Sequence, residues 1–418
     1  MWTAALVTFK WTAALAALPR IQVDRVSRNF VDAKGNTRVF HGVNAVEKLH
    51  PYLPEATGFS IQRSLSAHDA ANLSSWGLNV VRLGVLWAGV MPQPGQVNQT
   101  YLDSALRIVR TLAEFGVYTL IDMHQDSMGA RFCGEGFPDW AVRKALQKSG
   151  FNSSSTSSRF PAPFRWDMKI DPATGWPSRQ ACASHDFSNY YVAEEATAAR
   201  VAFFASPELH ADFAEHWAAV AKAFKGESAV LGYELINEPW NNAPWASDAK
   251  ELLPLYSALH QSIRQHDEDA IVFYEPHVLN GQLGVPSDFP AGGPGGEKFN
   301  DRQAFAYHIY CQNETESAPA LLVCDAALRI GWSSMTRSAH IGGGRMLTEF
   351  GAVSDSSHAV DVLKMSLSHA DAHMASWAYW SFKALDDSSH AGALNPVGSM
   401  CMLPAPLRRC ATALLLSA

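Results

Sequence analysis

The chain has 418 residues, of which 47% are hydrophobic and 17% are charged, and its formal net charge is −7. This length allows one large domain or two smaller ones, and the composition favours a packed core over a disordered chain. The negative net charge gives no electrostatic reason to expect a nucleic acid as partner.

The first 20 residues are apolar and rich in alanine. The run from Trp11 to Leu18 has the length of the hydrophobic part of a signal peptide and is too short to span a bilayer. No later segment reaches the length of a transmembrane helix. We therefore expect residues 1–20 to be a signal peptide, and the protein to be secreted or lumenal rather than transmembrane.

The six cysteines lack the paired Cys-x-x-Cys spacing of a zinc site. Cys311 and Cys324 enclose a short loop and could form a disulfide in an oxidising compartment. Cys133 and Cys182 are a second candidate pair, across a longer stretch of chain. Disulfides would agree with an extracellular or lumenal location.

Short apolar runs alternate with amphipathic stretches along most of the chain, which is the pattern of a parallel β/α fold. We predict eight strands, at residues 39–44, 80–83, 118–122, 230–234, 271–274, 305–308, 345–348 and 376–380. Helices are predicted at residues 66–76, 101–115 and 252–265. The sequence therefore predicts an α/β fold, a closed (β/α)8 barrel over residues 21–390.

The third and fourth predicted strands are separated by about 100 residues, far more than a simple β/α crossover needs. Helices are predicted within this insertion at residues 193–205 and 208–224. Because the insertion follows a strand, it lies on the face where barrel active sites gather, and we expect it to shape the substrate cleft. Residues 391–418 form a short tail, in which 406–416 could supply a last helix.

Two glutamates follow predicted strands that lie across the barrel from each other. Glu238 stands in an Asn-Glu-Pro sequence after the fourth strand, and Glu349 in a Thr-Glu-Phe-Gly sequence at the seventh. Cleavage of a glycosidic bond needs two such carboxyl groups, one to protonate the leaving oxygen and one to attack the anomeric carbon. The amide of Asn237 can hydrogen-bond a sugar hydroxyl beside the scissile bond.

Polar and aromatic residues at the other strand ends complete this set, and they are Arg82, His124, Asp126, His308, Tyr310 and Trp380. Together with the two glutamates they resemble glycoside hydrolase family 5, whose members are retaining enzymes on a (β/α)8 barrel. The resemblance covers roughly residues 35–385. The His-Gly-Val-Asn run at 41–44 followed by Lys48, and the stretch from His124 to Trp140 with its Cys-Gly-Glu-Gly run, are similar to the endoglycoceramidase branch. Members of that branch release the glycan of a glycosphingolipid from ceramide.

The resemblance implies roles for these residues. Glu238 would be the acid/base, Glu349 the nucleophile, and Arg82 and Tyr310 the partners of the nucleophile. Asn237, His124 and His308 would bind the sugar or orient the carboxylates. Lys48 and Asp126 would bind sugar hydroxyls, and Trp380 would be a stacking platform. Burial and the charge opposite should raise the pKa of Glu238, and the two carboxyl groups should lie about 5–5.5 Å apart in a retaining enzyme.

Simpler interpretations of the same residues remain open. His124 and His308 could be buried structural histidines, and Lys48 and Asp126 could be ordinary loop charges. A metal site built from the two histidines and Asp126 would leave both glutamates without a role. No cofactor is implied.

Three further carboxylates need a place in this scheme. Glu275 also ends a strand, and we expect a structural or supporting role for it. Glu135 and Asp139 are expected to order the loop that contains them.

Several functions are compatible with this site. The leading hypothesis is endo-acting cleavage between oligosaccharide and ceramide, and the alternatives are a glucosylceramide or steryl-glucoside β-glucosidase or another family 5 β-glucanase. A catalytically inactive glycolipid-binding protein is the alternative of another class, because the C-terminal β-sandwich of the branch is expected to be missing. Apolar segments at 160–166 and 240–245 could hold lipid tails beside a membrane surface. We expect a monomer.

Overall fold

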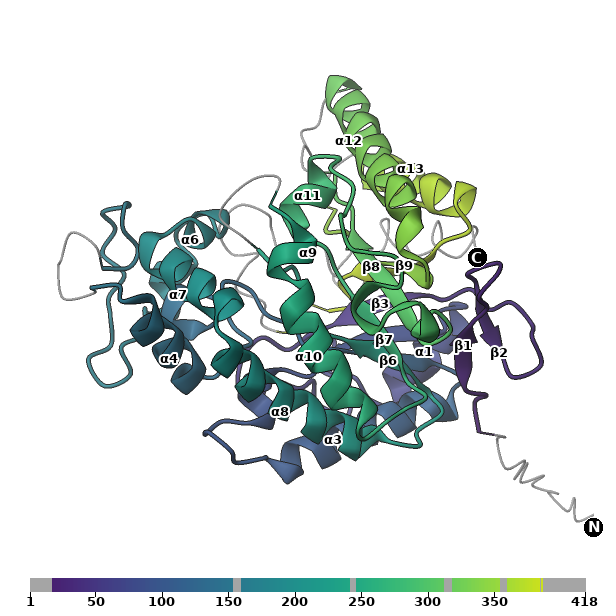
Figure 1. The fold of residues 1–418 in the computed structure, drawn as a ribbon, viewed down its shortest axis with the longest axis horizontal. Coiled ribbons are helices and arrows are strands. Elements are labelled where there is room, and N and C mark those ends of the chain that lie inside the picture. The colour runs from purple at the N-terminus through teal and green to yellow at the C-terminus, as the bar shows by residue number, and fades with distance from the viewer. Residues whose placement is uncertain are drawn as a thin grey trace, which may run out of the picture.

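Eight parallel strands close into a barrel in the computed structural model, which describes residues 17–152, 159–240, 246–311, 318–353, 359–383 and 385 (Figure 1). Their order around the barrel is β10-β3-β4-β5-β6-β7-β8-β9. The strands are β3 (His41–Ala45), β4 (Val80–Gly84), β5 (Tyr118–Asp122), β6 (Val230–Glu234), β7 (Ile271–Tyr274), β8 (Gln303–His308), β9 (Gly344–Gly351) and β10 (Ser376–Trp380). Each predicted strand overlaps an observed one, so the predicted barrel is confirmed.

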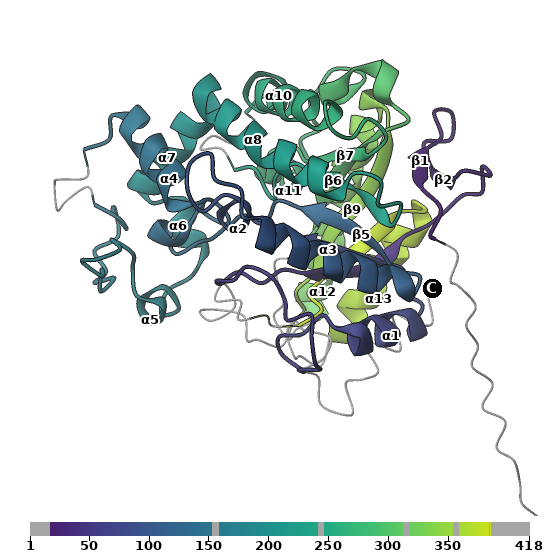
Figure 2. The same cartoon turned by 90° about the horizontal axis from the view of Figure 1, so that it is seen from below.

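Helices cover the outside of the barrel (Figures 1 and 2). They are α1 (Ala67–Ser75), α2 (Trp87–Val90), α3 (Gln99–Glu114), α8 (Pro207–Phe224), α9 (Asp248–Glu251), α10 (Leu253–Arg264), α11 (Val278–Gln282), α12 (Ala318–Arg337) and α13 (Ala359–Ala372). Short 3₁₀ turns lie between them at η2 (Gly293–Gly295), η3 (Glu297–Phe299) and η4 (Ser338–Ile341). Five of the helices, counting α7 in the insertion described below, fall where the sequence predicts them.

Helix α3 illustrates why these segments become helical. Leu102, Ala105, Val109 and Leu112 recur at helical spacing and are all buried, so one apolar stripe packs on the barrel. The side chain of Asn98 begins the helix by accepting a hydrogen bond from the Tyr101 backbone at 3.2 Å. Apolar periodicity and a capping residue therefore place this helix locally, before any long-range contact is considered.

A small antiparallel hairpin closes the N-terminal end of the barrel. It consists of β1 (Ile21–Val23) and β2 (Phe30–Asp32). Ile21, Val23 and Phe30 join the apolar side chains at the bottom of the barrel interior, and the Phe30 ring stacks on Phe273 at 5.9 Å. This end of the barrel is consequently packed with apolar side chains.

The long insertion between β5 and β6 forms a separate lobe before it continues into α8. Its elements are η1 (Ala130–Phe132), α4 (Asp139–Ser149), α5 (Arg179–Cys182), α6 (Ser188–Tyr191) and α7 (Glu194–Ala205). In both views, α4, α6 and α7 lie at the opposite end of the molecule from the β1–β2 hairpin (Figures 1 and 2). The insertion therefore flanks the end of the barrel at which the strands terminate.

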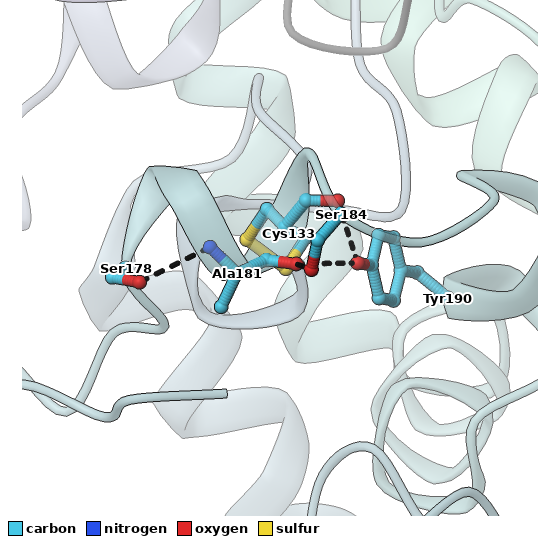
Figure 3. The surroundings of a disulfide bond; sticks show 6 residues. Cys133, Ser178, Ala181, Ser184 and Tyr190 are labelled. Carbon is cyan, nitrogen blue, oxygen red and sulfur yellow. Dashed lines mark hydrogen bonds between the residues drawn. A yellow bond between two sulfur atoms is a disulfide. The ribbon is translucent and has the colours of Figure 1, made fainter. Parts of the chain in front are cut away.

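A disulfide joins the segment before α4 to α5 within this lobe. Cys133 is bonded to Cys182, and the turn that carries Cys182 is held by its own hydrogen bonds (Figure 3). Ser178 Oγ accepts from the Ala181 backbone at 3.2 Å, and the Tyr190 hydroxyl donates to the Cys182 carbonyl at 2.7 Å. A second disulfide joins Cys311 and Cys324, so both predicted pairs are confirmed.

Some predictions fall on parts of the chain that the structure does not describe. Residues 1–16 of the expected signal peptide and the tail at 391–418, with its candidate helix at 406–416, lie outside the described residues. Within the described ranges, none of the helices combines the length and the apolar character that crossing a membrane requires.

Candidate active site

Arg82 lies at the centre of a cluster of carboxylates inside the upper part of the barrel. Its side chain is completely buried, with Nη1 2.6 Å from Glu349 Oε1 and Nη2 3.0 Å from Asp122 Oδ1. Nε donates to Glu234, and Glu275 lies 3.7 Å from Nη2. These side chains come from the neighbouring strands β4, β5 and β6, from the end of β7 and from β9, so barrel closure is what brings them together. One cation thereby holds four carboxyl groups at the floor of the site.

The charges in this cluster are redistributed by burial. Burial opposes the charge of Arg82, but the surrounding carboxylates outweigh this effect and hold its pKa well above its usual range. Burial raises the pKa of Glu234 to about 7, against the opposing effect of Arg82. Burial and the neighbouring Glu234 raise the pKa of Glu275 well above its usual value. The cluster therefore carries less negative charge at neutral pH than its composition suggests.

Two asparagines tie the cluster to the barrel backbone. Arg82 donates to Asn44 Oδ1 at 3.0 Å and to Asn237 Oδ1 at 2.8 Å. Asn44 Nδ2 donates to the carbonyls of Thr348 and Ala378, which belong to the last two strands. Asn237 Nδ2 donates to the Gln125 carbonyl at 3.1 Å. These contacts fix the orientation of Arg82 from both sides of the barrel.

The two candidate catalytic glutamates face each other above this floor. One carboxylate oxygen of Glu238 lies within 4.8 Å of one carboxylate oxygen of Glu349, and His308 lies within the same radius of both. His308 Nδ1 is 2.8 Å from Glu238 Oε1, and the Tyr310 hydroxyl donates to Glu349 Oε2 at 2.6 Å. This separation is closer to the about 5–5.5 Å of retaining glycosidases than to the about 6.5–9.5 Å of inverting ones.

The protonation of these groups differs from that in water. Burial, together with the charge of Asp126, raises the pKa of Glu238 to about 7. Burial lowers the pKa of His308 to about 4, so its ring is neutral at physiological pH and can hold Glu238 in place without adding charge. Burial and the charge of Glu349 raise the pKa of Tyr310 well above its usual value, so the phenol remains a donor. Glu238 keeps 21% of its side chain exposed and can reach a substrate.

A second charged group lies on the side of the site formed by β3 and β5. Lys48 Nζ pairs with Asp126 Oδ2 and lies 3.3 Å from Glu135 Oε1. It also lies 5.1 Å from the centroid of the Trp380 ring. That ring is stacked on His124 at 5.1 Å with an interplanar angle of 16°. Trp380 therefore packs against both Lys48 and His124.

Neighbouring carboxylates set the charges of this group. Asp122 Oδ2 lies 2.8 Å from His124 Nδ1. Burial opposes the charge of His124, but Asp122 and Asp126 outweigh it and raise the pKa of His124 to about 10. Burial likewise opposes the charge of Asp126, while Lys48 lowers the pKa of that carboxyl well below its usual range. The group therefore contains two cations and a firmly ionised Asp126.

The structure brings together all ten site residues that the sequence predicts, at the C-terminal end of the barrel. Their grouping differs from the metal hypothesis, because His124 and Asp126 lie beside Glu135, whereas His308 lies beside Glu238 and Glu349. The sequence predicts that Glu135 orders the loop that contains it. In the structure, Glu135 also forms an ion pair with Lys48. Asp139 accepts hydrogen bonds from Trp176 Nε1 at 2.9 Å, which fits the loop-ordering role expected of it.

Sequence reasoning missed several members of the site. Asp122 and Glu234 are the last residues of β5 and β6. They could have been found in the same way as Arg82, as polar residues at the ends of predicted strands. Tyr191, from the insertion, donates to Asp126 Oδ1 at 2.6 Å, and no local signal marks it.

The segments expected to hold lipid tails have mixed environments. Phe160 and Ala162 are buried within the insertion, and Phe164 stacks on Trp166 at 4.4 Å. Trp240 is half-buried, with its ring 4.9 Å from that of Tyr191. Residues 241–245 lie outside the described part of the chain. The first segment therefore mainly packs the insertion together.

Comparisons with known proteins place this site in a family. The model of the cellulase family, glycosyl hydrolase family 5, matches residues 55–386. The endoglycoceramidase of Cyanea nozakii is 34% identical over 378 residues, which cover 87% of this chain and 69% of that protein. The endoglycoceramidase of Hydra vulgaris is 36% identical over 304 residues, which cover 69% of this chain and 55% of that protein. The solved structure of endo-glycoceramidase II from Rhodococcus sp. shares the fold, with a TM-score of 0.69 and 24% identity over 92% of this chain and 79% of that one. The chain therefore belongs to the cellulase family, glycosyl hydrolase family 5.

Proposed function

We propose that this protein is a retaining, endo-acting β-glycosidase that hydrolyses the linkage between oligosaccharide and ceramide in glycosphingolipids. The observation that carries the reaction type is the facing pair of Glu238 and Glu349, with carboxylate oxygens within 4.8 Å of each other. The similarity to endoglycoceramidases over most of the chain supports the glycosphingolipid as substrate.

The first chemical step forms a glycosyl-enzyme. Glu349 Oε attacks the anomeric carbon, the bond from that carbon to the ceramide oxygen breaks, and Glu238 gives its proton to the departing oxygen. Arg82 and Tyr310 hold the attacking carboxylate by hydrogen bonds and orient it. Burial keeps Glu238 protonated near neutral pH, because its pKa is raised to about 7.

The second step returns the enzyme to its starting state. Glu238, now ionised, takes a proton from a water molecule, whose oxygen attacks the anomeric carbon and releases Glu349. Neutral His308 holds Glu238 at 2.8 Å through both steps. The products are a free oligosaccharide and ceramide, and the two carboxyl groups end in the protonation states in which they began.

The sugar-binding roles are also part of this proposal. Trp380 offers an aromatic face to the reacting sugar, and Lys48, Asp126 and His124 supply charged groups for its hydroxyls. Asn237 completes the set from the other side of the barrel. Each of these side chains lies at the C-terminal end of a barrel strand or in the loop that follows it.

We place the protein in a secreted or lumenal compartment, where its two disulfides would be stable. A substrate anchored in a membrane requires transient contact with the membrane surface. A monomer suffices for the reaction, since every site residue comes from one chain.

The proposal is tested with a ganglioside that carries a fluorescent ceramide and, separately, with fluorescent glucosylceramide. Wild-type protein should release intact oligosaccharide and fluorescent ceramide from the ganglioside. Glu349→Gln should abolish this release, while Glu114→Gln, an exposed position on α3, should leave it unchanged. Cleavage of glucosylceramide alone would replace the proposal by a β-glucosidase. A folded wild-type protein that cleaves neither lipid would refute the proposed cleavage of glycosphingolipids and favour glycolipid binding.

A further inference from the structure

The acid/base candidate Glu238 lies in a strained turn after β6. Its φ of 41° falls in the left-handed region, which a residue with a side chain adopts only where its surroundings hold it there. Gln125 supports the turn from one side, because its Nε2 donates to the Asn237 carbonyl at 2.8 Å. His308 binds the carboxyl group of Glu238 at 2.8 Å. The backbone beyond Glu238 must be held by other residues if the carboxyl group is to stay aimed at the substrate.

The segment that follows β7 supplies these contacts. Glu275 Oε1 accepts a hydrogen bond from the Glu238 backbone at 3.3 Å. The Pro239 carbonyl accepts one from the Val278 backbone at 3.1 Å, and it lies 3.3 Å from His277 Nδ1. Proline has no backbone N–H, so its carbonyl is the polar group by which this position can be held. The segment therefore binds the acid/base turn at two successive residues.

Neighbouring residues fix His277 in turn. Its side chain is 1% exposed, and its backbone N–H donates to Asp248 Oδ1, in α9, at 2.9 Å. The Phe204 ring packs edge-on against the imidazole, with ring centroids 6.2 Å apart. Glu251, also in α9, lies 3.5 Å from Nε2. These contacts leave the ring little freedom to turn away from Pro239.

The chemistry of the imidazole defines the contact with Pro239. A carbonyl oxygen only accepts hydrogen bonds, so Nδ1 must carry a proton in this contact. Burial lowers the pKa of His277 below its usual value, against the opposing charges of Glu251 and Asp288. Near neutral pH the ring is therefore neutral, with its single proton on Nδ1. His277 can thus hold the Pro239 carbonyl without adding charge beside the acid/base.

Packing alone does not require a histidine at this position. Removing an imidazole from water is unfavourable, and an apolar side chain of similar size would fill the same space without that cost. What the imidazole adds to the acid/base turn is its hydrogen bond to Pro239. We propose that His277 is a positioning residue, which keeps the carboxyl group of Glu238 directed at the leaving oxygen by holding the Pro239 carbonyl. This inference rests on the proposed acid/base role of Glu238.

The test compares two β-lactosides that differ only in the leaving group. Dinitrophenolate departs without a proton, whereas the phenol of phenyl β-lactoside needs one from Glu238. His277→Leu removes the Nδ1 donor, so kcat/KM for the phenyl lactoside should fall by about 10- to 100-fold, and kcat/KM for the dinitrophenyl lactoside by less than about threefold. Because both substrates carry the same sugar, any change in sugar binding cancels from the ratio of the two values.

Conservative variants separate positioning from packing. The amide nitrogen of His277→Asn can take the place of Nδ1 and donate to Pro239, so this variant should recover most of the activity on the phenyl lactoside. His277→Gln places its amide near the position of Nε2 and should behave like His277→Leu. His210 is also buried and binds the Phe204 carbonyl at 3.0 Å, so His210→Leu is the matched control and should leave the ratio unchanged.

Three kinetic outcomes would overturn the inference. One is an equal loss on both lactosides in His277→Leu, and another is no loss on either, since a residue that only packs the fold does not alter the dependence on the leaving group. The third is a His277→Asn variant that is no more active on the phenyl lactoside than His277→Gln. This last comparison decides the question if His277→Leu does not fold.

Nuclear magnetic resonance of isotope-labelled glutamate gives a result that needs no turnover, with the Glu238 signal assigned by its loss in Glu238→Gln. The pKa of Glu238, about 7 in the wild type, should fall toward 4.5 in His277→Leu as the turn loosens and admits water, and should stay near 7 in His210→Leu. An unchanged pKa in His277→Leu would overturn the inference. Wild-type protein that shows this fall, or the predicted lactoside ratio, but cleaves no glycosphingolipid would support the positioning role and refute only the proposed substrate.

Discussion

The two ends of the barrel interior are filled by opposite kinds of side chain. The N-terminal end holds an apolar cluster that includes Ile21, Val23, Phe30, Phe40 and Phe273. The C-terminal end holds Arg82 with Asp122, Glu234, Glu275 and Glu349. Burying a large apolar side chain stabilises a fold by about 1.5–3 kcal/mol, whereas burying charges has a desolvation cost that pairing only partly offsets. The apolar end thus stabilises the barrel, whereas the charged end lowers its stability and carries the candidate catalytic groups.

The largest effect is expected at Glu238. Glu238→Ala removes the proton donor, so cleavage of a ceramide-like alcohol should fall by about 1000-fold, while a dinitrophenyl glycoside, whose leaving group needs no proton, should react with little change in its first step. Values of kcat/KM for the two substrates measure this difference. An equal loss on both substrates would contradict the acid role. Glu114→Gln serves as the control.

Removing Arg82, the cation at the centre of the carboxylate cluster, should strongly destabilise the fold. Arg82→Met leaves Asp122, Glu234 and Glu349 buried without their partner, so the free energy of unfolding should fall by about 4 kcal/mol. Arg110, whose ion pair with Glu227 lies on the surface, is the matched control, and Arg110→Met should lose less than about 1 kcal/mol. Denaturant unfolding measures both values. Similar losses in the two variants would show that the buried cluster does not depend on Arg82.

At the apolar end, a cavity should reduce stability without affecting the reaction. Phe273 is completely buried and stacks on Phe30, so Phe273→Ala should lower the free energy of unfolding by about 3 kcal/mol. The kcat of the protein that remains folded should be unchanged. Leu322→Ala, at a side chain that is 74% exposed, should change stability by less than about 0.5 kcal/mol. A large fall in kcat of folded Phe273→Ala would show that the two ends are coupled.

At the charged end, neutralising Glu238 should give a pH-dependent gain in stability. The pKa of Glu238 is about 7 in the folded protein and 4.5 ordinarily, so the folded state holds this proton more tightly. Stability of the wild type therefore falls, through this group, as pH rises from about 4.5 to about 7. Glu238→Gln lacks this loss, so its melting temperature relative to wild type should increase over that window. A difference that does not vary with pH would contradict the raised pKa, and Glu114→Gln should show no such trend.

Much of the barrel could be predicted because its signals are local. Residues 118–122, 230–234, 271–274 and 376–380 are strands in both the prediction and the structure, since each is an apolar run of strand length. The contact of Arg82 with Glu349 was predicted from the resemblance and is confirmed. Its contact with Glu234 was not predicted, because Glu234 lies 152 residues away in the sequence and only closure of the barrel brings the two together.

Other parts of the site depend on geometry that the sequence does not specify. Tyr191 reaches Asp126 because the insertion folds back over the barrel end. The ion pair of Glu135 with Lys48 follows from the backbone pairing of the Glu135 loop with Asp126. Both features arise from tertiary packing, for which single residue types give no signal.

The pairing of β10 with β3 also has a consequence for how the protein is made. Asn44 donates to the carbonyls of Thr348 and Ala378, so the first barrel strand has no partner on one edge until the last strand has been synthesised. During translation, the growing chain therefore carries an open sheet edge for most of its length. Contacts this distant in sequence form slowly, and exposed edges favour aggregation. Closure of the barrel therefore has to wait until residues 376–380 have been synthesised.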